Sequence, residues 1–167
     1  MQITIRKFTK NDIPKKVEWI NNPQNNRYLH YDLPLEIIKT ERWFDTNAGR
    51  TDRYDAVIEA DGVPVGLIGL LSIDYKNKKA EYYISMGDTD YKGKGIAKEA
   101  SRLILNYGFN ELKLNRIFLY TETDNLAAQK LFESIGFVKE GCLKEDVVSH
   151  GGFSDRFMYG YLRKNWK

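Results

Sequence analysis

The sequence predicts an α/β (α+β) fold in which helices flank a central, mostly antiparallel mixed sheet. Short alternating apolar runs, bounded by turn signals such as Asp61-Gly62, predict strands. Apolar residues at helical spacing in residues 96–107 and 126–135 predict amphipathic helices. The resulting order, β-α-α-β-β-β-α-β-α-β-β, differs from the strict strand–helix alternation of a doubly wound dinucleotide-binding fold. With 167 residues and no repeat or linker, we expect one domain over residues 1–167.

The expected elements follow in order along the chain. Residues 3–8 alternate as a strand, and Pro14 stands early in a helix that ends near residues 21–23. A second helix follows Pro34. The remaining elements are strands at 54–60, 63–73 and 79–86, a helix after the glycines at 93 and 95, a strand at 115–121, a helix between Asn125 and Gly136, and strands at 137–148 and 153–162.

Composition and charge exclude several classes of protein. Apolar residues at 42% and charged residues at 29% are ordinary for a globular domain, and a net charge of +3 with scattered basic residues does not indicate nucleic acid binding. No apolar run approaches the roughly 20 residues that span a bilayer, and the N-terminus lacks a signal-peptide core, so we expect a cytoplasmic protein that binds no membrane. One cysteine and two histidines predict no metal site and no disulfide, and Cys142 is expected to be a buried thiol.

Residues 82–97 read as an apolar strand, a polar loop and a glycine-rich turn that opens directly into a helix. Such a turn presents free backbone N–H groups at a helix N-terminus, which favours a phosphate or pyrophosphate. Gly93 and Gly95 lack the Cβ atoms that would keep a diphosphate away from the main chain. Lys92 and Lys94 add positive charge at the same place. The segment therefore predicts a site for a phosphorylated cofactor, with a plain tight turn as the alternative.

Three phosphate-binding patterns compete for this turn. The P-loop pattern Gly-x-x-x-x-Gly-Lys-Ser/Thr occurs nowhere in the chain. The dinucleotide pattern Gly-x-Gly-x-x-Gly/Ala fails because Ala97 comes one position early and Lys98 stands where the third small residue belongs. The third pattern, Arg/Gln-x-x-Gly-x-Gly/Ala, belongs to the coenzyme A site of the GCN5-related N-acetyltransferases (GNAT), and residues 92–97 resemble it with Lys92 in first place.

A second motif lies downstream. Residues 123–137 closely resemble the second signature of the same family, Asn-x-x-Ala/Ser-x-x-x-Tyr-x-x-x-Gly-Phe. Both motifs occur in the family's order and the element order also matches, so the chain is identified as a member of the GNAT superfamily over essentially its whole length. Residues 18–23, 41–44 and 80–84 resemble the branch that acetylates ribosomal-protein N-termini and the branch that acetylates nucleotide-linked amino sugars.

The resemblance implies a GNAT fold and direct transfer of an acetyl group from acetyl-CoA to a primary amine, without a metal. It implies that the main chain of Ile84, Ser85 and Met86 pairs with the pantetheine arm, and that an amide near Ile84 polarises the thioester carbonyl. The residues that would hold the rest of the cofactor are Lys92, Gly93, Lys94, Gly95, Ile96, Ala97, Asn125 and Lys130. For Lys130, a solvated helix lysine is an equal alternative.

The reaction also needs a base, because an ammonium has no lone pair. Glu81 stands on the strand beside the expected thioester site, where burial would raise its pKa, although binding of substrate or pairing with a lysine is an equal alternative. Tyr83 lies two residues on, on the same face, and could donate a hydrogen bond or simply pack. Many relatives have a tyrosine as the acid of the second signature, but this chain has Phe132, which cannot donate a proton. Ser134, a water, or departure of an unprotonated thiolate are the alternatives.

Acceptor residues are expected from the first third of the chain and from the last turn. The candidates are Trp19, Asn22, Arg27, Tyr28, His30, Trp43 and Phe153, with core packing as the competing role for each. The resemblance implies a small-molecule amine, such as an amino-sugar nucleotide, or a peptide N-terminus as partner, and a homodimer. No acidic cluster in the sequence marks a polyamine or aminoglycoside pocket, which disfavours both acceptors.

Two other functions compete with the acetyltransferase. The first is a non-catalytic acyl-CoA-binding regulatory module, which would keep the site at residues 93–97 and lack turnover; Phe132 favours it slightly. The second is a nicotinamide-dependent oxidoreductase, which the element order disfavours. A thiol-release assay separates the first from the enzyme, and NADH binding tests the second.

Overall fold

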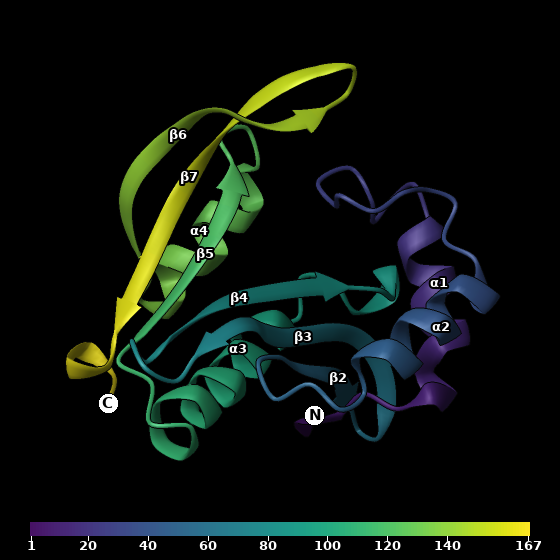
Figure 1. Cartoon of the computed structure of the whole chain (residues 1–167), viewed down its shortest axis with the longest axis horizontal. Helices are drawn as coiled ribbons and strands as arrows, with labels where there is room; N and C mark the ends of the chain where they lie inside the picture. The colour runs from purple at the N-terminus through teal and green to yellow at the C-terminus, as the bar shows by residue number, and fades with distance from the viewer.

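Seven strands form one mixed sheet in the computed structural model, which describes residues 1–167 (Figure 1). The strand order is β1-β2-β3-β4-β5-β7-β6, and every neighbouring pair is antiparallel except β4 and β5, which run parallel. The strands are β1 (Ile3–Lys7), β2 (Tyr54–Ala60), β3 (Val63–Asp74), β4 (Lys79–Met86), β5 (Arg116–Glu122), β6 (Val138–Ser149) and β7 (Gly152–Leu162). The fold class and the order of the elements predicted from the sequence are confirmed.

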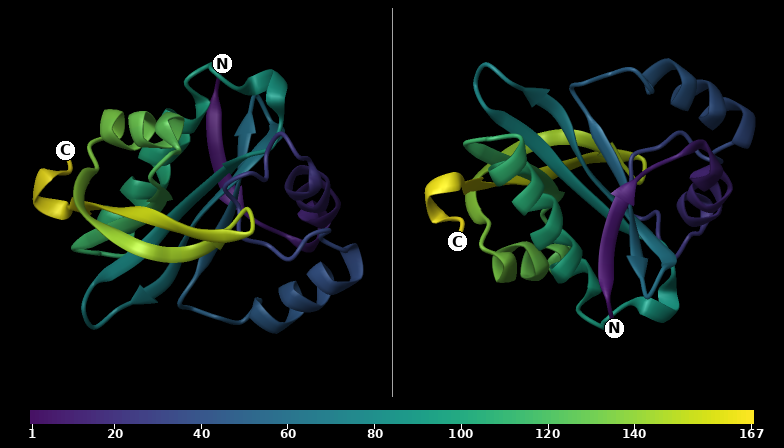
Figure 2. Two further views of the ribbon diagram at one scale, coloured as in Figure 1. Left: turned by 90° about the horizontal axis from the view of Figure 1, so that it is seen from above. Right: turned by 90° about the horizontal axis from the view of Figure 1, so that it is seen from below.

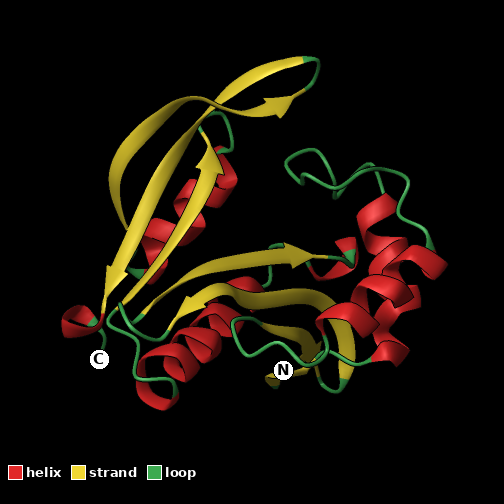
Figure 3. Ribbon diagram, viewed as in Figure 1, coloured by secondary structure: helices red, strands yellow, loops and turns green.

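Four helices accompany the sheet (Figure 3). They are α1 (Ile13–Asn21), α2 (Ile37–Asn47), α3 (Ile96–Asn106) and α4 (Leu126–Ile135), and a π-helical turn at Tyr107–Glu111 continues α3. Pro14 stands in the first turn of α1, where its missing N–H costs nothing. No helix is long and apolar enough to cross a bilayer.

The helices divide between the two faces of the sheet. Ala56 and Ile58 of β2 join the larger apolar core together with Ile104 of α3. Val57, which points to the opposite face, joins a smaller cluster with Ile13 of α1. The alternation along β2 therefore places α3 and α1 on opposite sides of the sheet (Figure 2).

The sheet opens between β4 and β5. These two strands pair only over residues 79–81 and 116–118, although β4 continues to Met86 and β5 to Glu122. Beyond the paired residues they diverge, so that the second half of β4 has one edge without a strand partner (Figure 1). Unpaired backbone groups on such an edge are available to another amide-bearing chain.

One expectation about the last strands is wrong. Cys142 is exposed rather than buried. The reason is its strand: β6 is an edge strand that pairs only with β7, and most of its residues face solvent. An apolar-looking strand pattern predicts the strand correctly and says little about whether a layer covers it.

Candidate active site

The glycine turn at the N-terminus of α3 has the geometry that a phosphate site requires. Gly93 and Gly95 have φ angles of 77° and 78°, a region that residues with a Cβ rarely adopt. A Cβ built on either glycine would meet no atom within 4 Å, so the space above the turn is open. The N–H groups of residues 93–97 donate to no backbone carbonyl. These groups, including those of Ile96 and Ala97, are free to bind an anion.

Two lysines flank this turn. Lys92 Nζ donates a hydrogen bond of 2.9 Å to Asn25 Oδ1, which links the turn to the loop after α1. Lys94 Nζ lies 5.4 Å from the centroid of the Tyr91 ring. Neither ammonium is paired with a carboxylate, so both can contribute their charge to a bound diphosphate.

The open edge of β4 lines a large cleft. Ile84, Ser85 and Met86, the three residues expected to pair with the pantetheine arm, all contribute to its wall, and Lys92 stands at the same cleft. The cleft has a volume of about 880 Å³ and runs between the diverging strands. A binding space of this size suits a cofactor arm together with a small acceptor.

Helix α4 supplies the opposite wall of the cleft, and only some of the residues predicted there face it. Asn125 lines the cleft and caps the helix, its Oδ1 accepting a hydrogen bond of 3.3 Å from the Ala128 N–H. Phe132 also lines the cleft. Lys130 is exposed and does not line it. Ser134 is exposed as well, and its hydroxyl donates to the Leu131 carbonyl at 2.7 Å, so it is not placed to protonate a leaving thiolate.

Glu81 stands on β4 at the point where the strands part. It lines the cleft, and its carboxylate makes no hydrogen bond or ion pair with another side chain. Burial raises the pKa of the Glu81 carboxyl above its usual range, and the charge of Arg156 opposes that rise. A carboxylate that is partly desolvated and otherwise unengaged is suited to accept a proton from a substrate.

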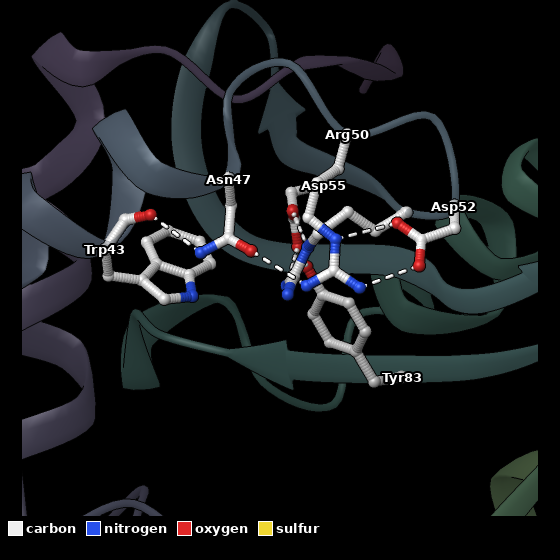
Figure 4. Close-up of polar contacts among 7 residues, drawn as sticks. Trp43, Asn47, Arg50, Asp52, Asp55 and Tyr83 are labelled. Atoms are coloured by element: carbon white, nitrogen blue, oxygen red, sulfur yellow. Dashed lines mark hydrogen bonds and ion pairs between the residues drawn. The ribbon is translucent and has the colours of Figure 1, made fainter.

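Tyr83 faces the same cleft, but its hydroxyl is already engaged (Figure 4). The hydroxyl donates to Asp55 Oδ1 at 2.5 Å, and Asp55 also pairs with Arg53 at 2.7 Å. Burial alone would raise the pKa of Asp55, but the hydrogen bonds from Arg53 and Tyr83 outweigh it and hold that pKa below its usual range. Burial and the Asp55 charge raise the pKa of the Tyr83 hydroxyl well above normal. This arrangement favours the packing role over the catalytic one for Tyr83.

The predicted acceptor residues separate into two groups. Tyr28, His30 and Trp43 line the cleft. Trp19 does not: it is 5% exposed, and a Cβ built on Gly87 would lie 2.1 Å from its ring, so the indole is packed in the core. The other three that do not line the cleft are Asn22, whose Oδ1 accepts from the Gln24 N–H at 3.0 Å, Arg27, which lies 3.7 Å from Asp124, and Phe153, which is 68% exposed.

Sequence reasoning missed several charged and aromatic residues of the cleft. Glu122, Tyr120 and Arg156 come from β5 and β7, and Lys16 comes from α1. The sequence predicts that β5 ends at Thr121, one residue before its observed end at Glu122. Extending its alternation by that residue puts Glu122 on the face of Phe118, which is paired with Glu81, and this signal could have found it. No group of three or more His, Cys, Asp or Glu side chains is placed to hold a metal ion.

A parallel strand pair that splits beside a glycine-rich helix N-terminus, with an unengaged carboxylate at the split, defines the class of coenzyme A-dependent acyltransferases. The family model described as an acetyltransferase (GNAT) domain matches residues 2–138, and the chain belongs to this family. It is an acetyl-CoA-dependent N-acetyltransferase, as the resemblance of its two motifs implied.

Three members of the family illustrate which proteins this chain resembles in sequence and structure. The chain is 26% identical over 169 residues to the spermidine N(1)-acetyltransferase of Escherichia coli, covering 98% of this chain and 90% of that protein. It is 34% identical over 109 residues to the putative ribosomal N-acetyltransferase YdaF of Bacillus subtilis, covering 64% of this chain and 58% of that one. A crystal structure of the spermidine N-acetyltransferase of Vibrio cholerae, in complex with CoA and spermine, superposes with a TM-score of 0.92 at 28% identity, covering 99% and 98% of the two chains. The likeness to YdaF supports the ribosomal branch only loosely.

Proposed function

We propose that the acceptor of this acetyltransferase is a small aliphatic amine with more than one ammonium group, and that Glu81 is the base that deprotonates it. The observation that carries the proposal is the position of Glu81 in the cleft where β4 and β5 part, without a side-chain partner. A negative group at this point attracts an ammonium and can then accept its proton.

The transfer has a simple balance. Glu81 takes one proton from the acceptor ammonium, and the free amine nitrogen forms a bond to the acetyl carbonyl carbon. The carbon–sulfur bond of the thioester breaks, and the sulfur leaves as a thiolate. The attacking nitrogen, which still carries one proton too many, releases it to the thiolate or to water and becomes the neutral amide nitrogen. The N–H groups of residues 93–97 would hold the pyrophosphate, and a main-chain N–H near Ile84 would polarise the thioester oxygen. No residue is assigned as the acid, because Phe132 has no proton to give.

The charges that remain unpaired in the cleft support a polycationic acceptor. Of the carboxylates that line it, Asp55 is paired with Arg53, and Glu36 lies 2.7 Å from Lys39. Glu81 pairs with no cation. The lining carboxylates are Asp32, Glu36, Asp55, Glu81 and Glu122. They come from four parts of the chain, so the fold gathers carboxylates that form no cluster in the sequence. Five basic side chains line the same cleft, namely Lys16, Lys39, Arg53, Lys92 and Arg156.

The relatives named spermidine N-acetyltransferases support the same class of acceptor. The two acceptors that the sequence resemblance suggested, a protein N-terminus and an amino-sugar nucleotide, remain the competitors. A cytoplasmic location and a homodimer stay predictions.

The experiment is a steady-state thiol-release assay with acetyl-CoA and one acceptor of each class. The panel holds spermidine, a nucleotide-linked amino sugar and a short peptide with an N-terminal alanine, each at several concentrations. We expect the highest kcat/KM with spermidine. A higher kcat/KM with the peptide or the amino sugar would contradict the polyamine acceptor. Binding of acetyl-CoA without turnover of any amine would favour the non-catalytic acyl-CoA-binding module.

A further inference from the structure

Glu122, the last residue of β5, is a buried carboxylate with an unsatisfied oxygen. Its side chain is 3% exposed. Oε2 accepts a hydrogen bond of 3.3 Å from Ser149 Oγ, whereas Oε1 is buried and accepts none. Burying a carboxylate without a full set of partners is costly, so a functional reason for it is expected, and binding of a cationic ligand is one such reason.

The cations near Glu122 do not neutralise it permanently. Arg156 is its direct neighbour on β7, but the guanidinium of Arg156 bonds to Asp146 at 2.7 Å and lies 4.5 Å from the centroid of the Tyr120 ring. His30 Nε2 lies 2.9 Å from Glu122 Oε1, and this contact is an ion pair only when the imidazole is protonated. His30 belongs to the loop between α1 and α2, so a residue outside the sheet covers this oxygen.

The position of Glu122 relates it to the proposed base. Glu81 of β4 is paired in register with Phe118 of β5, and Glu122 follows Phe118 by four residues, on the same face of the strand. Four residues of strand span about 13 Å. Both carboxylates line the cleft between the diverging strands. An extended acceptor that offers one nitrogen to Glu81 can therefore reach Glu122 with another.

We propose that Glu122 is a specificity-determining residue, which binds a second ammonium group of the acceptor, and that His30 covers the carboxylate until the acceptor displaces it. The imidazole nitrogen beside Oε1 marks the position that the ammonium takes. The cleft then prefers linear amines with ammonium groups at both ends to monoamines of equal length. This inference rests on the proposed function, because it assumes that the acceptor binds in the cleft beside Glu81.

The test is a calorimetric titration of the CoA-bound protein with two ligands of equal length, a linear eight-carbon diamine and the matching monoamine. We expect the wild type to bind the diamine about tenfold more tightly, as one charged hydrogen bond allows. Glu122→Gln keeps the shape of the side chain and should bind the two amines within about twofold of each other, with the affinity for the monoamine unchanged. The matched control is Asp124→Asn. Asp124 lies two residues after Glu122 and its side chain is exposed, so this variant removes the same charge outside the cleft and should keep the tenfold preference for the diamine.

A second variant gives an effect of the opposite sign. His30→Ala uncovers Glu122 and should tighten diamine binding about threefold, because the ammonium no longer competes with the imidazole. If Glu122→Gln folds poorly, diamine binding by His30→Ala still tests the role of Glu122. An undiminished diamine preference in Glu122→Gln, or weaker diamine binding in His30→Ala, would overturn the assignment. Since the readout is binding, absence of acetyl transfer would count against the proposed function alone.

Discussion

The phenyl ring of Phe132 packs edge-on against the ring of Tyr82, with centroids 5.8 Å apart and an interplanar angle of 88°. Phe132 stands at the place where the signature it resembles has a tyrosine. The Tyr82 hydroxyl cannot replace it, because it is buried and shares a hydrogen bond of 2.7 Å with Ser101 Oγ. Neither ring therefore offers a proton to the cleft.

Phe132→Tyr should raise kcat. The new hydroxyl would lie in the cleft wall and could protonate the leaving thiolate. We expect a gain of about tenfold, less than the usual effect of an acid, because a thiol with a pKa of about 8.5 already leaves readily. Steady-state thiol release measures it, with an unchanged KM for acetyl-CoA. Phe137→Tyr is the control, since Phe137 is buried in the same aromatic group but does not line the cleft. An equal gain in both variants, or none in Phe132→Tyr, would contradict the explanation.

Glu81→Gln should lower kcat by about 10²- to 10⁴-fold while sparing acetyl-CoA affinity. The pH profile carries the sharper test. Only the carboxylate form accepts a proton, and burial raises the pKa of Glu81. The wild-type rate should therefore climb with pH through a range above the ordinary glutamate value of about 4.3, and the variant should lack that climb.

The matched control for this base is Glu18→Gln. Glu18 lies on α1 with a side chain that is 68% exposed, and it should leave both rate and profile unchanged. A rate and pH profile unaltered by Glu81→Gln would remove Glu81 from the chemistry and favour a role in binding the acceptor.

Gly95→Arg should abolish CoA binding, because the side chain fills the open space above the turn and strains a backbone with a φ of 78°. Calorimetry with CoA measures the loss. Gly62 offers a close control, since its φ is 79° and its built Cβ also meets no atom within 4 Å, yet it lies in the turn between β2 and β3. Gly62→Arg carries the same strain and should bind CoA normally. Equal loss in both variants would mean that destabilisation, and not occupation of the diphosphate space, is the cause.

The burial of Lys16 should make the free energy of unfolding depend on pH. It is 8% exposed, with Nζ 3.8 Å from the centroid of the Trp43 ring, and burial lowers its pKa from 10.5 to about 8. Between these two values the unfolded chain binds more protons than the native one, so the free energy of unfolding should rise with pH through that range. Lys16→Met should be more stable than the wild type at neutral pH and should lose this rise. Thermal unfolding of both proteins from pH 7 to 10 checks it, and parallel curves would contradict the pKa shift.

The fold could be predicted because its signals are local. The Asp61-Gly62 turn, the apolar stripe of α3 and the Asn125 and Gly136 ends of α4 each specify an element from a few adjacent residues. The cofactor side of the site has the same property, since Ile84–Met86 and the glycine turn are neighbours in sequence. The predicted and observed strand boundaries differ by one residue at most.

The acceptor side could not be predicted in the same way. Glu122, Arg156 and Lys16 come from separate elements, and only the split sheet brings them to one cleft. Tyr28, His30 and Trp43 were predicted as acceptor residues and do line it. Trp19 was predicted to line the acceptor site, but it does not. An aromatic residue near a loop suits a binding wall or a core equally, and only its packing against Gly87 decides for the core.

Acetyl transfer from acetyl-CoA to an amine in the cleft beside Glu81 is the reaction that we propose for this chain. The most direct test is turnover with spermidine in which thiol release and the mass of the amine product are followed together. We expect one thiol released for each acetylated amine, with both signals falling together in Glu81→Gln. Thiol released without an acetylated amine, or tight acetyl-CoA binding with neither product, would contradict it.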